Sequence, residues 1–229
     1  MRRSTLIFIL SIVFMAQAAE YNRSTFYQAF LQSDLSEWHD FIADKLYVSN
    51  DSLLLILDLE YNYLAWASTQ DIDDNQQLLG QFNRHISRYE SLATGNKTAL
   101  SDFYTFRSAS HVYSVSILNK SNLSHSLQAI TAANRACEKP TARALMHQGF
   151  MYFYRPDYAG GSKEEALEFL RKAEKGFLRQ KNNAEDWNLR NTQMHIAQCL
   201  IKLGRHDEAR QYINQILKEE PNFKFLKEL

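Results

Sequence analysis

The hydrophobic residues of this chain recur at intervals of three and four positions, which predicts one helix after another. Between residues 34 and 48 they fall on one side of a helix, and Ser33 precedes them as a candidate N-cap. The stretch of residues 52–68 is apolar almost all round, which predicts a buried central helix capped by Asp51. The remaining helices are expected at residues 24–32, 71–93, 98–118 and 123–137, and from about Pro140 onwards.

Composition supports the same fold class. The chain of 229 residues has only 7 glycines and 3 prolines, whereas all-β proteins need more turn residues than that. Hydrophobic residues make up 45%, as in ordinary globular proteins. The formal net charge is zero and no clustered basic face stands out, so we expect an all-α protein without a nucleic-acid partner.

The first 19 residues have the pattern of a secretory signal peptide. Arg2 and Arg3 precede an apolar core at residues 6–14, and small residues at 16 and 18 mark a cleavage site. A membrane anchor is the alternative, but a bilayer span needs about 20 apolar residues. We therefore expect an exported chain, in the periplasm or secreted, without stable membrane insertion after cleavage.

Residues 154–173 contain a firm break between two helices. Pro156 ends the first helix, and Gly160 can take a positive φ in the loop. Ser162 is placed to cap the next helix, and Glu165 lies three residues later, as in a capping box. The break is expected to be the corner of a helical hairpin; a flexible lid over a substrate is the alternative.

The C-terminal stretch of residues 192–222 resembles a tetratricopeptide repeat (TPR). Ala197 and Ala209 occupy the small positions of the two helices, Gly204 lies in the turn between them, and Pro221 closes the unit. The resemblance implies antiparallel helical hairpins stacked as a short, right-handed, TPR-like solenoid.

An earlier unit follows the same plan, with Gly149 and Ala166 in the small positions. They lie 17 positions apart, five more than the 12 from Ala197 to Ala209, so the corner between them is longer. All four small residues are expected where neighbouring helices touch too closely for a larger side chain. A third, more degenerate unit is expected at residues 98–140.

The wider pattern is similar to a group of exported TPR-like proteins of Bacteroidota-type bacteria. The resemblance covers residues 123–229 and, loosely, residues 51–118, and it implies a fold but no reaction. The expected organisation is a signal peptide at 1–19, an N-terminal helical region at 20–97 and TPR-like repeats at 98–229. The matching positions are Arg143, Ala144, Leu145, Gly149, Tyr154, Pro156, Gly160, Gly161, Lys163 and Ala166.

Catalytic and metal-binding motifs are absent from the sequence. It has no nucleophile elbow, zinc-protease motif or phosphate-binding glycine loop, and its 7 histidines are widely spaced. We therefore expect a non-enzymatic protein without a metal or cofactor. Export makes a disulfide between Cys137 and Cys199 possible, but two separate buried thiols are the preferred interpretation.

The first helix of each hairpin is expected to line a concave face that binds a protein or peptide partner. Alternatively, these residues pack on the N-terminal helices. A second function hypothesis is a small-ligand binder or enzyme with a pocket between the N-terminal helices and the repeats, where histidines would converge. The predicted lining residues are Arg143, Met146, Phe150, Tyr154, Asn191, Met194, Gln198 and Lys202.

Overall fold

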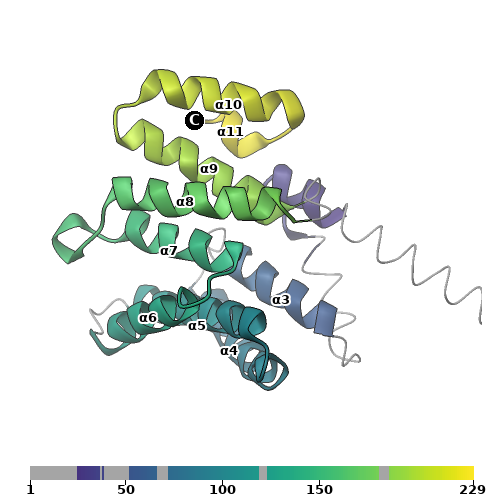
Figure 1. Cartoon of the computed structure of the whole chain (residues 1–229). Helices are drawn as coiled ribbons and strands as arrows, with labels where there is room; N and C mark the ends of the chain where they lie inside the picture. Colours follow the sequence, from purple (N-terminus) through teal and green to yellow (C-terminus); the bar gives the residue numbers. More distant parts are fainter. Residues whose placement is uncertain (1–24, 37, 39–51, 66–71, 119–122, 181–185) are drawn as a thin grey trace, which may run out of the picture.

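The protein is a stack of helical hairpins, shown in Figure 1 as a computed structural model. Every regular element in the parts of the chain that the structure describes is helical, and none is a strand. Those parts are residues 25–36, 38, 52–65, 72–118, 123–180 and 186–229. The predicted signal peptide, the cap at Asp51 and the turn at 119–122 lie outside them.

The helices follow one another in chain order and pack mainly against their sequence neighbours. A first helix covers residues 25–31. Three hairpins pair α5 with α6, α7 with α8, and α9 with α10, and Figure 1 shows the last two stacked above α4, α5 and α6. This arrangement confirms the predicted all-α, TPR-like solenoid. The elements are α3 (Ser52–Ala65), α4 (Ile72–Ala93), α5 (Lys97–Leu118), α6 (Leu123–Ala136), α7 (Ala142–Tyr154), the 3-10 turn η2 (Asp157–Ala159), α8 (Lys163–Leu178), α9 (Trp187–Lys202), α10 (His206–Glu219) and α11 (Lys224–Lys227).

The break after α7 is a fixed corner, as predicted. Gly160 has φ 84°, and a Cβ at Gly161 would lie 1.9 Å from the carbonyl oxygen of Arg155. Ser162 caps α8 by accepting a hydrogen bond of 3.1 Å from the backbone N–H of Glu165. A capping box also has a hydrogen bond from the backbone N–H of the cap residue to the Glu side chain, and this part of the prediction was wrong. The Ser162 N–H donates instead to the carbonyl oxygen of Tyr152 at 3.1 Å.

The four small residues are buried, as predicted, and Gly149 lies at a close helix crossing with Ala166. A Cβ on Gly149 would lie 2.7 Å from Cγ of Leu170 and 3.3 Å from the carbonyl oxygen of Ala166. Ala166 and Ala197 are fully buried and Ala209 nearly so. The register of the α7–α8 hairpin is therefore set by the close contact at Gly149.

Two predicted helix starts were wrong by one or two residues. Ser33 has φ 60° and ends the first helix, and Asp34 instead accepts hydrogen bonds from the backbone N–H and hydroxyl of Ser36. Thr141, rather than Pro140, begins the next hairpin, because its hydroxyl accepts a bond of 3.1 Å from the Ala144 N–H. Residues 39–48 of the predicted second helix lie outside the described residues.

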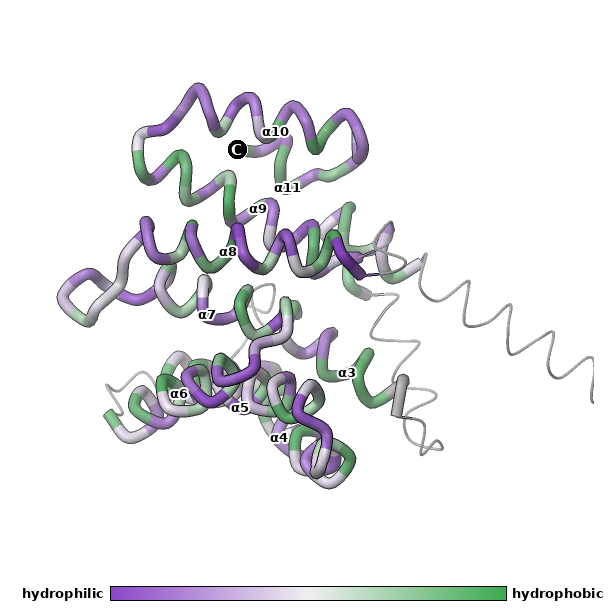
Figure 2. Tube along the Cα trace, in the orientation of Figure 1, coloured by the Kyte–Doolittle hydropathy of each residue, from purple (hydrophilic) through white to green (hydrophobic). Residues whose placement is uncertain are grey.

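Helix α3 is buried at the centre of the molecule, as its apolar pattern predicted. Leu55 and Leu59 pack in one hydrophobic cluster with aromatic residues of α4 and α5. Figure 2 shows how this differs from α10, along which polar residues predominate. None of the described helices has the length and hydrophobicity that a bilayer span requires.

The N-terminal helix of residues 25–31 packs against the opposite end of the chain. The ring of Phe30 lies 5.8 Å from that of Phe223, and Trp38 meets Trp187, the first residue of α9, at 4.7 Å. The hydroxyl of Tyr27 donates to Glu220 at 2.5 Å. The helix of residues 25–31 therefore packs on the last hairpin and the residues that follow it. The sequence pattern did not predict this contact.

The two cysteines are separate thiols. Both are free, Cys199 is buried in α9 and Cys137 is partly buried after α6. Burial raises the pKa of the Cys199 thiol to about 12, so this group is an unreactive part of the core.

Candidate functional site

Helices α7 and α9 lie side by side and point in the same direction. Near their beginnings, Arg143 and Asn188 both contact Glu60 of α3. Towards their ends, the ring of Phe150 lies 4.1 Å from that of His195. Arg143 and Phe150 of α7 therefore both lie next to residues of α9, with α3 beside them. That all eight predicted side chains line one concave surface stays a prediction.

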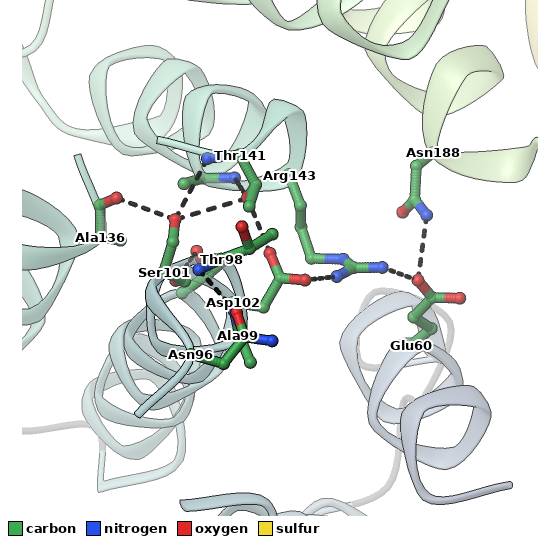
Figure 3. A network of polar contacts seen from close by, with 12 residues as sticks. Glu60, Asn96, Thr98, Ala99, Ser101, Asp102, Ala136, Thr141, Arg143 and Asn188 are labelled. Atoms are coloured by element: carbon green, nitrogen blue, oxygen red, sulfur yellow. Dashed lines mark hydrogen bonds and ion pairs between the residues drawn. The ribbon is translucent and has the colours of Figure 1, made fainter. Parts of the chain in front are cut away.

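The beginning of this surface is occupied by a buried ion-pair network (Figure 3). Arg143 donates to the carboxylates of Glu60 and Asp102, and Asn188 donates to Glu60 at 3.2 Å. The Thr141 hydroxyl donates to Asp102 at 2.7 Å. Burial raises the pKa of Glu60, although the positive charge of Arg143 opposes this shift. The network joins α3, α5, α7 and α9.

The middle of the surface is packed rather than open. Met146 of α7 is fully buried, and Asn191 of α9 is also buried. Phe150 stacks on Tyr63 of α3 with ring centres 6.4 Å apart. Met194 packs against the cluster formed by the N-terminal helix and the last hairpin.

The end of the surface is open. Tyr154, the last residue of α7, is 66% exposed. On α9, Gln198 is partly buried and Lys202 is exposed. The ends of the two helices thus present an aromatic ring, an amide and an ammonium group.

A buried histidine holds the exposed tyrosine in place. The Nδ1 of His195 lies 2.9 Å from the Asn191 carbonyl, which can only accept, so Nδ1 carries the proton. Burial lowers the pKa of His195 to about 4, so Nε2 is unprotonated at neutral pH. The Tyr154 hydroxyl therefore donates to Nε2 at 2.8 Å, and its ring is fixed while facing solvent.

The eight predicted residues therefore divide into two groups. Five of them pack within the protein: Arg143, Met146, Phe150, Asn191 and Met194. The other three, Tyr154, Gln198 and Lys202, remain at the open end. Their role in binding stays a prediction.

Sequence reasoning missed the residues that cover or support this face, namely Glu60, Tyr63 and His195. A signal for Glu60 existed, because an acid inside a buried apolar helix requires a partner. His195 follows Asn191 by four positions and so lies on the same helix face. No local pattern identified Tyr63 as a neighbour of Phe150.

The histidines of the described residues lie in separate places. His85 pairs with Asp58 of α3, His111 with His125 at 3.2 Å, and His147 with Tyr63 and Ser108. No group of three His, Cys, Asp or Glu side chains in the described residues is arranged to hold a metal ion.

A shallow hollow of about 410 Å³ lies elsewhere, between α8 and the turn after α9. Leu167, Arg171, Leu203 and Arg205 contribute to its lining, and none of the eight predicted residues does. It therefore does not coincide with the concave face.

Comparison with known proteins supports the repeat assignment. Residues 191–223 match the sequence model of the tetratricopeptide repeat family. This range contains most of α9, all of α10 and the residues up to Phe223. No curated protein and no solved structure matches the chain. The final helical hairpin is thus similar in sequence to a tetratricopeptide repeat.

Proposed function

We propose that the protein is a non-enzymatic interaction module that binds a protein or peptide at the open end of its concave face. The observation that carries this proposal is the change in exposure along two adjacent helices. On α7 the predicted residues pass from the buried Met146 to the exposed Tyr154, and on α9 they pass from the buried Asn191 to the exposed Lys202. The concave face of stacked helical hairpins is the usual binding surface of such proteins.

The chemistry of the open end suits protein recognition. Aromatic residues are enriched among the residues that contribute most to protein interfaces. Tyr154 is held by His195 before any partner arrives, so binding does not have to order this side chain. Pre-organisation of this kind lowers the entropic cost of association.

The cellular setting belongs to the same proposal. The basic start, apolar core and small residues of the first 19 positions support export. We place the protein in the periplasm or outside the cell, in a bacterium of the Bacteroidota type, where its partner would be another envelope or secreted protein.

Site-specific photo-crosslinking in the producing cell tests the proposal. A photoreactive residue at position 154 is expected to crosslink one partner that mass spectrometry identifies. The matched control is position 158, because Tyr158 lies in the corner after α7 and is 94% exposed. Crosslinking at 158 but not at 154, or equal capture of the same proteins at both, would contradict the proposal.

A further inference from the structure

Two histidines face each other across the α5–α6 hairpin. The Nδ1 atom of His111 on α5 lies 3.2 Å from the Nδ1 atom of His125 on α6, whereas the two ring centres are 5.4 Å apart. Because the nitrogens are much closer together than the ring centres, the Nδ1 edges of both rings point into the gap between the helices. Both residues are partly exposed, so the pair lies at the protein surface.

The hairpin holds this pair at a fixed separation. The buried residues of α6 are all alanines, and such small side chains let two helices approach closely. The Ser108 hydroxyl of α5 donates to the carbonyl oxygen of Ala129 on α6 at 2.8 Å. His111 follows Ser108 by three positions and His125 precedes Ala129 by four, so the bond and the pair lie on adjoining helical turns. Side chains carried by two packed helices are positioned more precisely than side chains on loops.

The separation of the two nitrogens matches that of two ligands on one metal ion. Imidazole nitrogens lie about 2.0–2.1 Å from a bound zinc ion. Two such nitrogens are therefore about 2.9 Å apart in a square-planar site and about 3.4 Å apart in a tetrahedral site. The observed 3.2 Å lies between these values. A metal ion thus requires the rings to turn until both lone pairs meet at the ion, but it does not require α5 to move against α6.

The protonation state of the pair is compatible with a bound metal ion. In the free protein one Nδ1 donates its proton to the other, and metal binding requires that this proton reside on Nε2 of the same ring instead. Burial, together with His125 and the charge of Arg107, lowers the pKa of His111, and metal-binding histidines must be neutral. The Arg107 charge also opposes a bound cation, but this side chain is half-exposed and lies 3.9 Å from a carboxylate oxygen of Glu90.

We propose that His111 and His125 form a surface site for a divalent transition-metal ion, with Cu²⁺ bound most tightly. Imidazole suits zinc, copper and nickel, and the affinity of a given site for these ions is highest for Cu²⁺. No third His, Cys, Asp or Glu of the described residues completes the site, so water fills the remaining positions.

The proposal departs from the metal-free protein that the sequence predicted. The two histidines are 14 positions apart on separate helices, and no metal-binding motif has this spacing. The site belongs to α5 and α6, whereas the eight predicted binding residues belong to α7 and α9. It therefore does not depend on the proposed function.

Titration of the full mature chain with Cu²⁺ tests the proposal. Isothermal calorimetry measures the affinity, and electron paramagnetic resonance shows whether two imidazole nitrogens bind the ion. His111→Gln and His125→Gln should each weaken binding at least about tenfold, because even partners outside the ligand shell are worth about 10- to 100-fold in metal affinity. Glutamine can still form a hydrogen bond between the helices, and circular dichroism checks that each variant is folded.

His206→Gln is the matched control, because His206 is exposed at the beginning of α10, and it should leave the affinity unchanged. Three results would overturn the proposal: no binding of Cu²⁺, binding that survives either of the first two changes, or an equal loss in His206→Gln. The pair would then be a hydrogen bond only. If a variant fails to fold, the resonance spectrum of the unaltered chain decides, since fewer than two imidazole ligands would also overturn the proposal.

Discussion

Close packing restricts which side chains the protein can accept at several buried positions. The space around Gly149 and around the buried histidines His147 and His195 leaves no room for a larger side chain or an added charge. His147 is bonded on both ring nitrogens, to Tyr63 and Ser108, so it links α7 to α3 and α5. The same residue types on the surface would be interchangeable with many others.

At this scale, we expect opposite effects from two glycine-to-alanine changes. Gly149→Ala should lower the free energy of unfolding by about 1–2 kcal/mol, because overpacking exceeds the gain in helix propensity. Gly80→Ala should raise it by about 0.5–1 kcal/mol, because among the described residues the atom nearest its added Cβ is the flexible end of Arg84 at 3.7 Å. Urea unfolding of both variants measures this, and equal effects would contradict the close crossing at Gly149.

The two buried histidines predict a pH dependence of stability. Burial lowers their pKa values to about 4 in the folded chain, whereas the unfolded value is about 6.5. The unfolded state therefore binds more protons between these values. The stability that the two neutral histidines contribute is fully present above pH 6.5 and is lost as the pH falls towards 4. NMR titration of the ring resonances should show both histidines neutral at pH 5.5, and titration near pH 6.5 would contradict their burial.

At the scale of elements, α3 holds the hairpins in place. Its Glu60 reaches α7 through Arg143 and α9 through Asn188, and its Tyr63 packs on Phe150. Asp102 of α5 shares the same arginine. The first half of the predicted concave face is thereby filled from within the chain, so our proposal places the partner at its end.

Removal of Glu60 tests this role. Glu60→Ala should lower the free energy of unfolding by about 3 kcal/mol, because it leaves a buried arginine with one carboxylate partner. The control is Glu168→Ala, which breaks an exposed ion pair of 2.6 Å with Lys172 and should cost less than about 1 kcal/mol. If Glu60→Ala lowers the free energy of unfolding no more than Glu168→Ala does, the ion-pair network does not hold α3 in place.

The sequence predicted contacts that depend on local spacing and missed those between distant segments. Gly149 meets Ala166 and Leu170 within one hairpin, so the repeat register was enough to place them. Glu60 and Arg143 are 83 positions apart, and their meeting depends on how successive hairpins stack. The predicted lining therefore included residues such as Met146 that the chain itself covers.

At the scale of the whole molecule, the helix of residues 25–31 covers part of the last hairpin. Phe26 stacks on Trp38 with ring centres 4.8 Å apart, and Phe30 meets both Phe223 and Phe225. Arg190 donates to Tyr27 and to Glu220. The ends of a helical repeat array expose apolar surface unless they are capped, and residues 25–31 together with Trp38 supply part of that cap here.

This arrangement predicts that the two ends of the chain unfold together. Phe30→Ala should cost about 3 kcal/mol through the cavity that it leaves, and it should speed hydrogen exchange in α11 (Lys224–Lys227). Leu127→Ala, at a half-exposed position of α6, is the control and should leave α11 unchanged. Exchange confined to the first helix would show that the ends are independent.

The central claim, that the concave face is closed at its beginning and open at its end, is tested most directly by hydroxyl-radical footprinting of the free and partner-bound protein. In the free protein we expect Tyr154 to be oxidised readily and Met146 to be protected, although methionine is readily oxidised where it is accessible. Partner binding should then protect Tyr154 and leave Tyr158 unchanged. Rapid oxidation of Met146 in the free protein, or a bound partner that leaves Tyr154 exposed, would contradict the claim.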